Sequence, residues 1–185
     1  MLRKLLGALV IAAGPAAATG IEITVAGEGA NGVIAIDLFE DVAPGHVDRI
    51  TTLAAQGAYD NVAFHRVINT FMAQTGDVEF GKLNDSYDAR NAGRGGSDLP
   101  DLAQEFSDIP FDGGVVGMAR SQDVDSANSQ FFIMFAPGYF LNNQYTVVGQ
   151  VTDGQDVVDA IKRGHPRSGA ITGAPDRMVT VTVTE

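Results

Sequence analysis

Residues 64–77 read FHRVINTFMAQTGD, and a strand through the start of this run would alternate its side chains between two faces. Period-two alternation places Arg66 on one face with Val62, Phe64 and Ile68. A permanently charged guanidinium on an apolar face costs free energy unless a partner or water solvates it. Either the stem of Arg66 packs on the sheet while its head reaches water, or the charge serves a site. The alternation alone favours the first interpretation.

A second run, SANSQFFIM over residues 126–134, alternates in the same way. Every second position is expected to fill the core, namely Phe131, Ile133 and Phe135. The positions between them share the opposite, outward face, namely Gln130, Phe132 and Met134. Apolar side chains exposed beside an amide are typical of a small apolar pocket with a polar rim. The alternative is an ordinary core, because a sheet can be covered on both sides.

Further strands and two helices surround these runs. A Gly-rich loop joins residues 21–25 to residues 33–39 in a predicted hairpin. One amphipathic helix is expected from Pro44 to a stop at Gly57, and another from Gly154 to Arg163 with Asp153 as its N-cap. Other short β-like runs cover residues 62–68, 71–74, 114–119, 130–135, 146–151 and 178–183.

Many short strands with Gly-rich turns and only two helices predict a mainly-β fold, a closed antiparallel barrel with helical caps. Residues 81–108 are polar and rich in Gly and Asp, and we expect a long surface loop there. The length of 185 residues suits a single core.

Composition narrows the classes of function. The net charge of −11 disfavours nucleic acid and anionic membrane surfaces as partners. The chain has no cysteine, and its three histidines are far apart without metal-ligand spacing. The glycines of residues 93–96 follow no strand and open no apolar helix, so a dinucleotide-binding interpretation fails on context.

The first 18 residues have the layout of a secretory signal peptide. Arg3 and Lys4 form a basic head, an apolar run follows, and residues 16–18 offer an A-x-A cleavage site before Thr19. An uncleaved anchor is the alternative, but the apolar run is about half of the ~20 residues that a span needs. We expect residues 19–185 to form one exported, periplasmic domain that leaves the membrane after cleavage.

The order and spacing of these segments resemble the cyclophilin family. Residues 64–77 match the family pattern F-H-R, two hydrophobic residues, x-x-F-M-x-Q-x-G-D, and residues 129–133 match S-Q-F-F-I letter for letter. Residues 114–119 match a third family segment, and residues 141–149 resemble a fourth with Val148 in place of Phe. The agreement extends over about residues 21–183 and favours a functional role for Arg66.

The resemblance implies an eight-stranded antiparallel barrel capped by two helices. It also implies a peptidyl-prolyl cis-trans isomerase that acts on proline-containing polypeptides without nucleophile, metal or cofactor, here assisting the folding of exported proteins, and expected to be a monomer. Arg66 matches the catalytic arginine, and Gln74 would hold it or bond the substrate backbone. The matching proline pocket comprises Phe71, Met72, Phe132 and Leu141. The groove for residues before the proline is matched by Ala119, Arg120 and Gln130.

Three further features of the substrate-binding region depart from many relatives. Arg120 stands where many have Asn, Phe140 where many eukaryotic members have Trp, and Tyr145 where His is common. The resemblance therefore implies activity with altered specificity. A module that only grips proline segments is the main alternative, although such a module would not need Arg66. A hydrolase of cell-envelope polymers suits the export signal, but the sequence offers no candidate dyad.

Overall fold

The computed structural model describes residues 19–85 and 87–185, so the predicted signal peptide lies outside the described residues. Strands are short and helices few, as the sequence predicts. The strands are β1 (Gly20–Ala26), β2 (Gly32–Leu38), β3 (Val62–Ala63), β4 (Arg66–Ile68), β5 (Met72–Thr75), β6 (Val115–Met118), β7 (Phe131–Met134), β8 (Val147–Asp153) and β9 (Arg177–Thr184). The helices are α1 (Pro44–Ala55), α2 (Gln155–Ala160) and the 3-10 turn η1 (Tyr139–Leu141).

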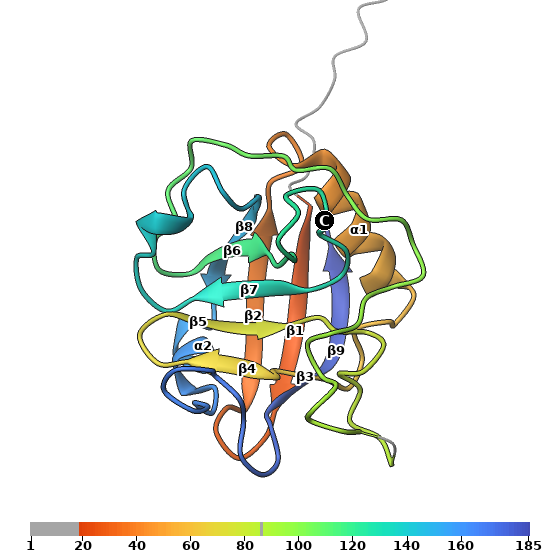
Figure 1. Cartoon of the computed structure of the whole chain (residues 1–185), viewed down its shortest axis with the longest axis vertical. Helices are drawn as coiled ribbons and strands as arrows, with labels where there is room; N and C mark the ends of the chain where they lie inside the picture. The colour runs from red at the N-terminus through yellow and green to blue at the C-terminus, as the bar shows by residue number, and fades with distance from the viewer. Residues whose placement is uncertain (1–18, 86) are drawn as a thin grey trace, which may run out of the picture.

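All the strands belong to one antiparallel sheet in the order β3-β9-β1-β2-β8-β6-β7-β5-β4. The predicted hairpin is confirmed as β1 and β2, which pair from Gly20 opposite Asp37 to Val25 opposite Gly32. The sheet curls strongly, so that β1, β2 and β9 run across the direction of β4, β5 and β7 in Figure 1. The mainly-β class with two helices is therefore confirmed.

The expected closed eight-stranded barrel is wrong, because the structure is a nine-stranded, curled half-barrel. The expected single strand over residues 62–68 is broken into β3 and β4, which form the two ends of the sheet. β3 pairs with β9, whereas the outer edge of β4 meets the loop that precedes β9, through a single bridge from Arg66 to Ala170. An irregular loop cannot continue a regular ladder, so the sheet stays open at this point.

The same break changes which side chains share a face. Val62, Phe64 and Val67 all belong to the main core, whereas Arg66 and Ile68 lie on the other side. The prediction that Arg66 shares a face with Val62 and Phe64 is therefore wrong, while the pairing with Ile68 is right.

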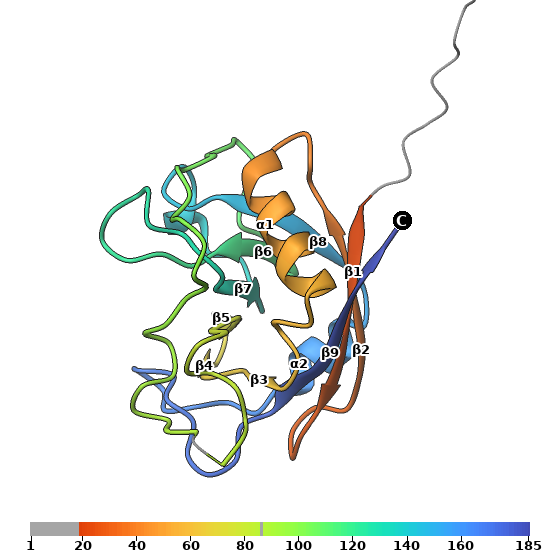
Figure 2. The same ribbon diagram turned by 90° about the vertical axis from the view of Figure 1, so that its right-hand side faces the viewer.

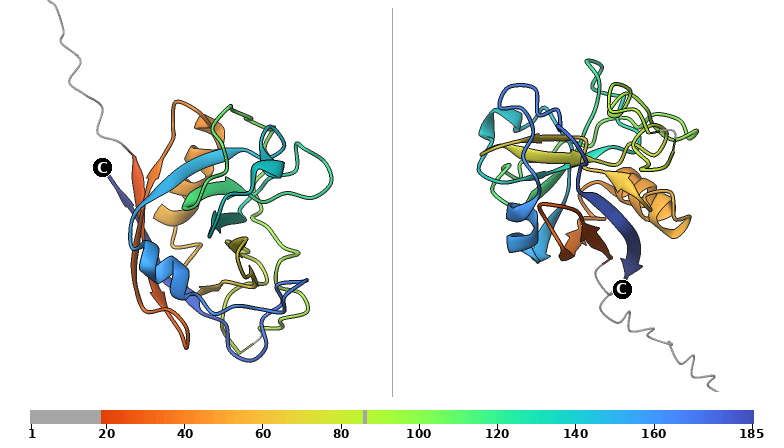
Figure 3. Two further views of the ribbon diagram at one scale, coloured as in Figure 1. Left: turned by 90° about the vertical axis from the view of Figure 1, so that its left-hand side faces the viewer. Right: turned by 90° about the horizontal axis from the view of Figure 1, so that it is seen from below.

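The two helices cover opposite sides of the curled sheet. Figure 2 shows α1 facing the viewer, and α2 faces the viewer in the opposite view on the left of Figure 3. α1 begins at Pro44 and buries Val47, Ile50 and Leu53, as the periodicity predicts. α2 is shorter than expected and begins after Gly154, which has a left-handed conformation and no side-chain cap.

The predicted N-cap at Asp153 is accordingly wrong. Asp153 is the last residue of β8, and its carboxylate accepts a hydrogen bond from the backbone N–H of Gly154 at 2.9 Å. Val158 and the following Ile161 are nevertheless buried, and Val157 packs partly buried against the main core, as an amphipathic helix requires.

Side chains of β5, β6 and β7 pack on both faces of the sheet. Phe131 and Ile133 join the main core inside the curl. The outward face carries a second apolar group, called here the pocket cluster, formed by Met72, Phe111, Val115, Phe132, Met134, Leu141 and Val147. Phe132 and Met134 do share the outward face, but they are buried and not exposed as expected.

The long loop is present as predicted. Between Thr75 and Val115 the described residues form no helix and no named strand, and the loop runs over the surface from β5 to β6 (Figure 1). Across residues 19–85 and 87–185, no helix is long and apolar enough to span a membrane.

Candidate active site

The pocket cluster forms the floor of a cavity of about 280 Å³ on the outward face of the sheet. The sequence-predicted site residues meet here, with Gln130 as the exception. The lining residues are Arg66, Phe71, Met72, Gln74, Ala119, Arg120, Phe132, Phe140, Leu141 and Tyr145. Residues as far apart in the chain as 66 and 145 therefore converge on one apolar hollow with a cationic rim.

Strand register brings the polar rim and the apolar floor together. Arg66 on β4 lies opposite Gln74 on β5, and Gln74 lies opposite Phe132 on β7. Phe132 in turn lies opposite Gly117 on β6. Because opposed residues in an antiparallel pair project from the same face, this row sets a charged group, an amide and an aromatic ring side by side.

The aromatic floor depends on Gly117. A Cβ at this position would lie 2.6 Å from a ring atom of Phe132 and 2.6 Å from a ring atom of Phe111. Without it, the two rings stack with centroids 5.7 Å apart, and the rings of Phe132 and Tyr145 meet edge to face with centroids 5.9 Å apart. The absence of a side chain at Gly117 therefore lets the ring of Phe132 lie flat against the sheet, as the floor of the cavity.

Arg66 forms no ion pair with any carboxylate of the described residues. Its Nη1 donates to Gln74 Oε1 at 3.0 Å and lies 3.8 Å from the sulfur of Met72. Burial lowers the pKa of the guanidinium, but arginine still remains a cation at neutral pH. The site thus holds a half-buried cation without a balancing anion beside an apolar cavity.

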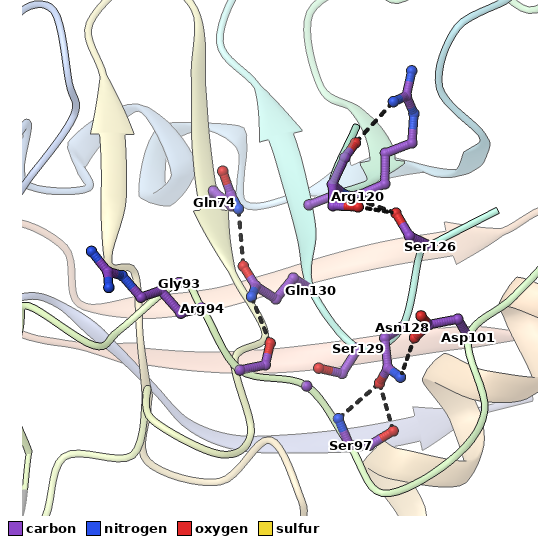
Figure 4. A pocket seen from close by; sticks show the side chains of 14 residues that line it. Gln74, Gly93, Arg94, Ser97, Asp101, Arg120, Ser126, Asn128, Ser129 and Gln130 are labelled. Carbon is purple, nitrogen blue, oxygen red and sulfur yellow. Dashed lines mark hydrogen bonds between the residues drawn. The ribbon is translucent and has the colours of Figure 1, made fainter. Parts of the chain in front are cut away.

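Gln74 and Gln130 continue the polar rim in a chain of hydrogen bonds. Gln74 Nε2 donates to Gln130 Oε1 at 2.9 Å, and Gln130 Nε2 donates to the carbonyl oxygen of Gly95 at 2.8 Å (Figure 4). Each amide uses its oxygen on one neighbour and its NH₂ on the next. Through these two hydrogen bonds, the long loop fixes the position of Gln74 beside Arg66.

A second cavity of about 490 Å³ adjoins the first and shares Gln74, Ala119 and Arg120 with it. This is where the structure places Gln130. The remaining lining residues were not predicted; they are Gly93, Arg94, Gly95, Gly96, Ser97, Asp101, Ser121, Ser126, Asn128 and Ser129. The repeated glycines were the available signal, but as a motif they indicated only nucleotide binding, which their context excluded.

Gly93 shows why this loop needs glycine. It has φ +94°, and a Cβ there would lie 2.8 Å from a ring carbon of His65. Burial lowers the pKa of His65 to about 4, so the imidazole is neutral at pH 7. The loop can therefore pack directly over an uncharged ring.

No group of three His, Cys, Asp or Glu side chains that could hold a metal ion occurs in the described parts of the chain.

Arg120 lines both cavities, and Tyr145 lines the first one beside it. The Arg120 guanidinium lies 4.4 Å from the centroid of the Tyr145 ring, and its Nη2 donates to the Gln144 carbonyl at 2.8 Å. Nη1 donates to the Ser121 carbonyl at 2.9 Å. These contacts hold the side chain of Arg120 against the protein and keep its positive charge where the two cavities meet.

The opposite rim is aromatic and open to solvent. Phe140 on η1 is 65% exposed, and the centroid of its ring lies 5.4 Å from the centroid of the Phe71 ring. Leu141, the next residue, turns inward and is buried in the pocket cluster. The 3-10 turn thus presents one side chain to the floor and the preceding one to the edge.

Such a site can bind an apolar ring and direct a fixed cationic donor at a group beside it. The profile of the family described as cyclophilin type peptidyl-prolyl cis-trans isomerase/CLD matches residues 21–184 of this chain. The chain belongs to the cyclophilin family. It is accordingly a peptidyl-prolyl cis-trans isomerase, an enzyme that needs no cofactor.

Individual relatives agree with this assignment. This cyclophilin is 54% identical over 153 residues to a probable peptidyl-prolyl cis-trans isomerase of Brucella suis, covering 83% of this chain and 78% of the relative. It is 34% identical over 172 residues to a peptidyl-prolyl cis-trans isomerase of Streptomyces antibioticus, covering 83% of this chain and 90% of the relative.

Solved structures agree with the fold. A crystal structure of a cyclophilin from Hirschia baltica matches with a TM-score of 0.71 and 25% identity, over 88% of this chain and 73% of the other. A Cryptosporidium parvum cyclophilin crystallised in the presence of the dipeptide Ala-Pro matches with a TM-score of 0.72 and 23% identity. The match covers 90% of this chain and 99% of the other.

Proposed function

We propose that Arg66 and Gln74 catalyse rotation about X-Pro peptide bonds whose proline ring occupies the 280 Å³ cavity. Phe71, Met72, Phe132 and Leu141 would contact the ring, with Phe140 and Tyr145 at the edges. Ala119, Arg120 and Gln130 would hold the residues that precede the proline. The substrates are proline-containing polypeptides, and the protein acts as a monomer.

The mechanism follows from what the twisted amide needs. The uncatalysed barrier is about 18–20 kcal/mol because twisting removes the resonance of the peptide bond. In the twisted state the lone pair is localised on the nitrogen, and charge on the carbonyl is redistributed. A fixed donor that meets this state better than either planar state lowers the barrier, because only such differential binding accelerates a reaction.

One observation carries the proposal: a half-buried arginine without an ion-pair partner in the described residues stands over an apolar pocket. A surface that merely gripped proline segments would be served by the apolar floor alone. Burying a guanidinium without a counter-ion costs free energy. Such a cost is expected where the charge acts on a bound substrate. Exchange of Arg66 tests the proposal, as set out in the Discussion.

We further propose that the enzyme is exported and assists the folding of exported proteins. The support is the signal-peptide layout of residues 1–18. The mature chain is expected to begin at Thr19, and its net charge to fall to −13 because Arg3 and Lys4 leave with the peptide. Cell fractionation with mass spectrometry of the recovered protein checks this. Material beginning at Met1, or mature-size protein found only in the cytoplasm, would refute export.

Cyclosporin-type ligands should bind this cyclophilin more weakly than they bind members with Trp at the position of Phe140. In those members the indole N–H donates a hydrogen bond to the ligand, and Phe140 has no donor. One neutral hydrogen bond contributes about 0.5–1.5 kcal/mol, or roughly two- to fifteen-fold in affinity. Phe140→Trp should therefore tighten inhibition by that factor.

Peptide turnover provides the control for this substitution. The exposed edge position of Phe140 leaves room for an indole, and a short prolyl peptide need not reach it. Turnover by Phe140→Trp should thus stay within about twofold of wild type. If inhibition does not tighten, the position is misassigned or Arg120 or Tyr145 limits the affinity.

A further inference from the structure

Asp77 follows strand β5 and is completely buried. Its two carboxylate oxygens hold different segments of backbone. Oδ1 accepts from the N–H groups of Glu79 at 3.1 Å and Phe80 at 2.8 Å. Oδ2 accepts from the N–H groups of Gly93 at 2.7 Å and Gly95 at 3.1 Å. One side chain therefore ties the start of the long loop to its glycine-rich part, 16 to 18 residues further on.

No ion pair of the described residues involves Asp77. The four backbone donors take the place of a cation, since several N–H bonds can stabilise a buried carboxylate. A neutral amide at this position would turn its NH₂ toward one pair of these N–H groups. The arrangement is thus specific for a carboxylate.

Gly95 connects this anchor to the catalytic rim. Its N–H is held by Asp77, and its carbonyl oxygen accepts from Gln130 Nε2 at 2.8 Å. That contact fixes which end of the Gln130 amide is the oxygen, and this oxygen accepts from Gln74 Nε2. Gln74 then has its own oxygen free for Arg66. Each amide has one acceptor end and one donor end, so the orientation set at Gly95 is passed on to Arg66.

We propose that Asp77 is a positioning residue for catalysis: by fixing the Gly95 carbonyl, it sets the orientation of the Gln130 and Gln74 amides and hence the place of the Arg66 guanidinium. The inference rests on the proposed role of Arg66. Asp77 does not touch the cavity and acts only through this chain of hydrogen bonds. Its loss should lower kcat more than it weakens peptide binding, because the apolar floor stays intact.

Asp176 offers a matched control for a purely structural role. It is also buried, at 1% exposure, and its carboxylate accepts from the backbone N–H groups of Gly29, Ala30 and Lys162 at 2.8–3.0 Å. Those segments contribute no residue to either cavity. Loss of this anchor should cost stability without disturbing Arg66.

The experiment compares Asp77→Asn and Asp176→Asn in the purified protein, with Arg66→Ala alongside. Thermal unfolding is measured first, and kcat and KM for a prolyl peptide are then measured at a temperature where every variant is folded. We expect kcat of Asp77→Asn to fall roughly tenfold to a hundredfold with KM within about twofold, the scale of a misplaced catalytic group. Asp176→Asn should lower the melting temperature and leave kcat within about twofold. Asp77→Ser replaces Asp77→Asn if the latter does not fold.

A double-mutant cycle with Gln130→Ala tests the route. In that background Asp77→Asn should lower kcat less than twofold further, because the link that it acts through is already missing. Unchanged kcat in Asp77→Asn, or equal kcat losses in both aspartate variants, would overturn the inference while a large loss in Arg66→Ala upholds the proposed function. Full activity in Arg66→Ala would instead remove the proposed function itself.

Discussion

Replacing Arg66 with alanine is expected to lower kcat/KM by about 10²–10³, the usual effect of removing one preorganised donor. The variant should remain folded, because Arg66 forms no ion pair in the described residues and its side chain is only half-buried. A protease-coupled isomerisation assay measures the rate, and thermal unfolding measured in parallel reports the fold.

Arg66→Lys is the matched comparison. Lysine keeps the charge but presents a point ammonium in place of a planar fork of donors, so it should restore little activity. The proposed role of Arg66 would fail if the alanine variant melted like wild type and turned over peptide at nearly the wild-type rate.

The second large effect concerns two neighbouring phenylalanines of β7 that face opposite sides of the sheet. Phe131 is fully buried in the main core, with its ring 5.6 Å from that of Tyr59. Phe132 is the aromatic wall of the cavity. Each change to alanine should lower the free energy of unfolding by about 3–5 kcal/mol. Only Phe132→Ala should also lower kcat/KM, by roughly tenfold or more, since it removes the surface that the proline ring contacts.

Denaturant unfolding and the isomerisation assay, both at a temperature where the two variants are folded, separate these effects. Phe131→Ala serves as the control for lost stability, because its side chain does not line either cavity. Equal catalytic losses in the two variants would mean that core packing, and not contact with substrate, limits activity.

Local periodicity predicted most of the elements well. The hairpin of β1 and β2, helix α1 and the two faces of β7 all follow from spacing that one segment determines alone. The opening of the sheet, which leaves a half-barrel in place of a closed barrel, was not predictable in this way. It depends on the run over residues 62–68, whose two halves pair with β9 and β5, more than a hundred positions apart in the chain.

The same difference between local pattern and long-range contact applies to the candidate site. The residues that meet at the 280 Å³ cavity were named from their match to the family's motifs, because strand alternation alone favoured a surface role for Arg66. Ala119, Arg120 and Gln130 of the second cavity were also named in this way, but its wall built by the irregular loop of residues 93–97 was missed. No periodicity signals where such a loop lies. Its position depends on tertiary anchors such as Asp77, which hold the backbone at Gly93 and Gly95.

The central claim is that Arg66 acts on the twisted amide and contributes little to binding the planar peptide. Exchange NMR on a saturating prolyl peptide measures the cis-trans interconversion rate on the enzyme, and a titration gives the Kd of the same peptide. Arg66→Ala should lower the on-enzyme rate by about 10² or more and leave the Kd within roughly twofold of wild type. An unchanged on-enzyme rate, accompanied by a Kd weakened enough to explain the loss in kcat/KM, would show instead that Arg66 binds the planar peptide.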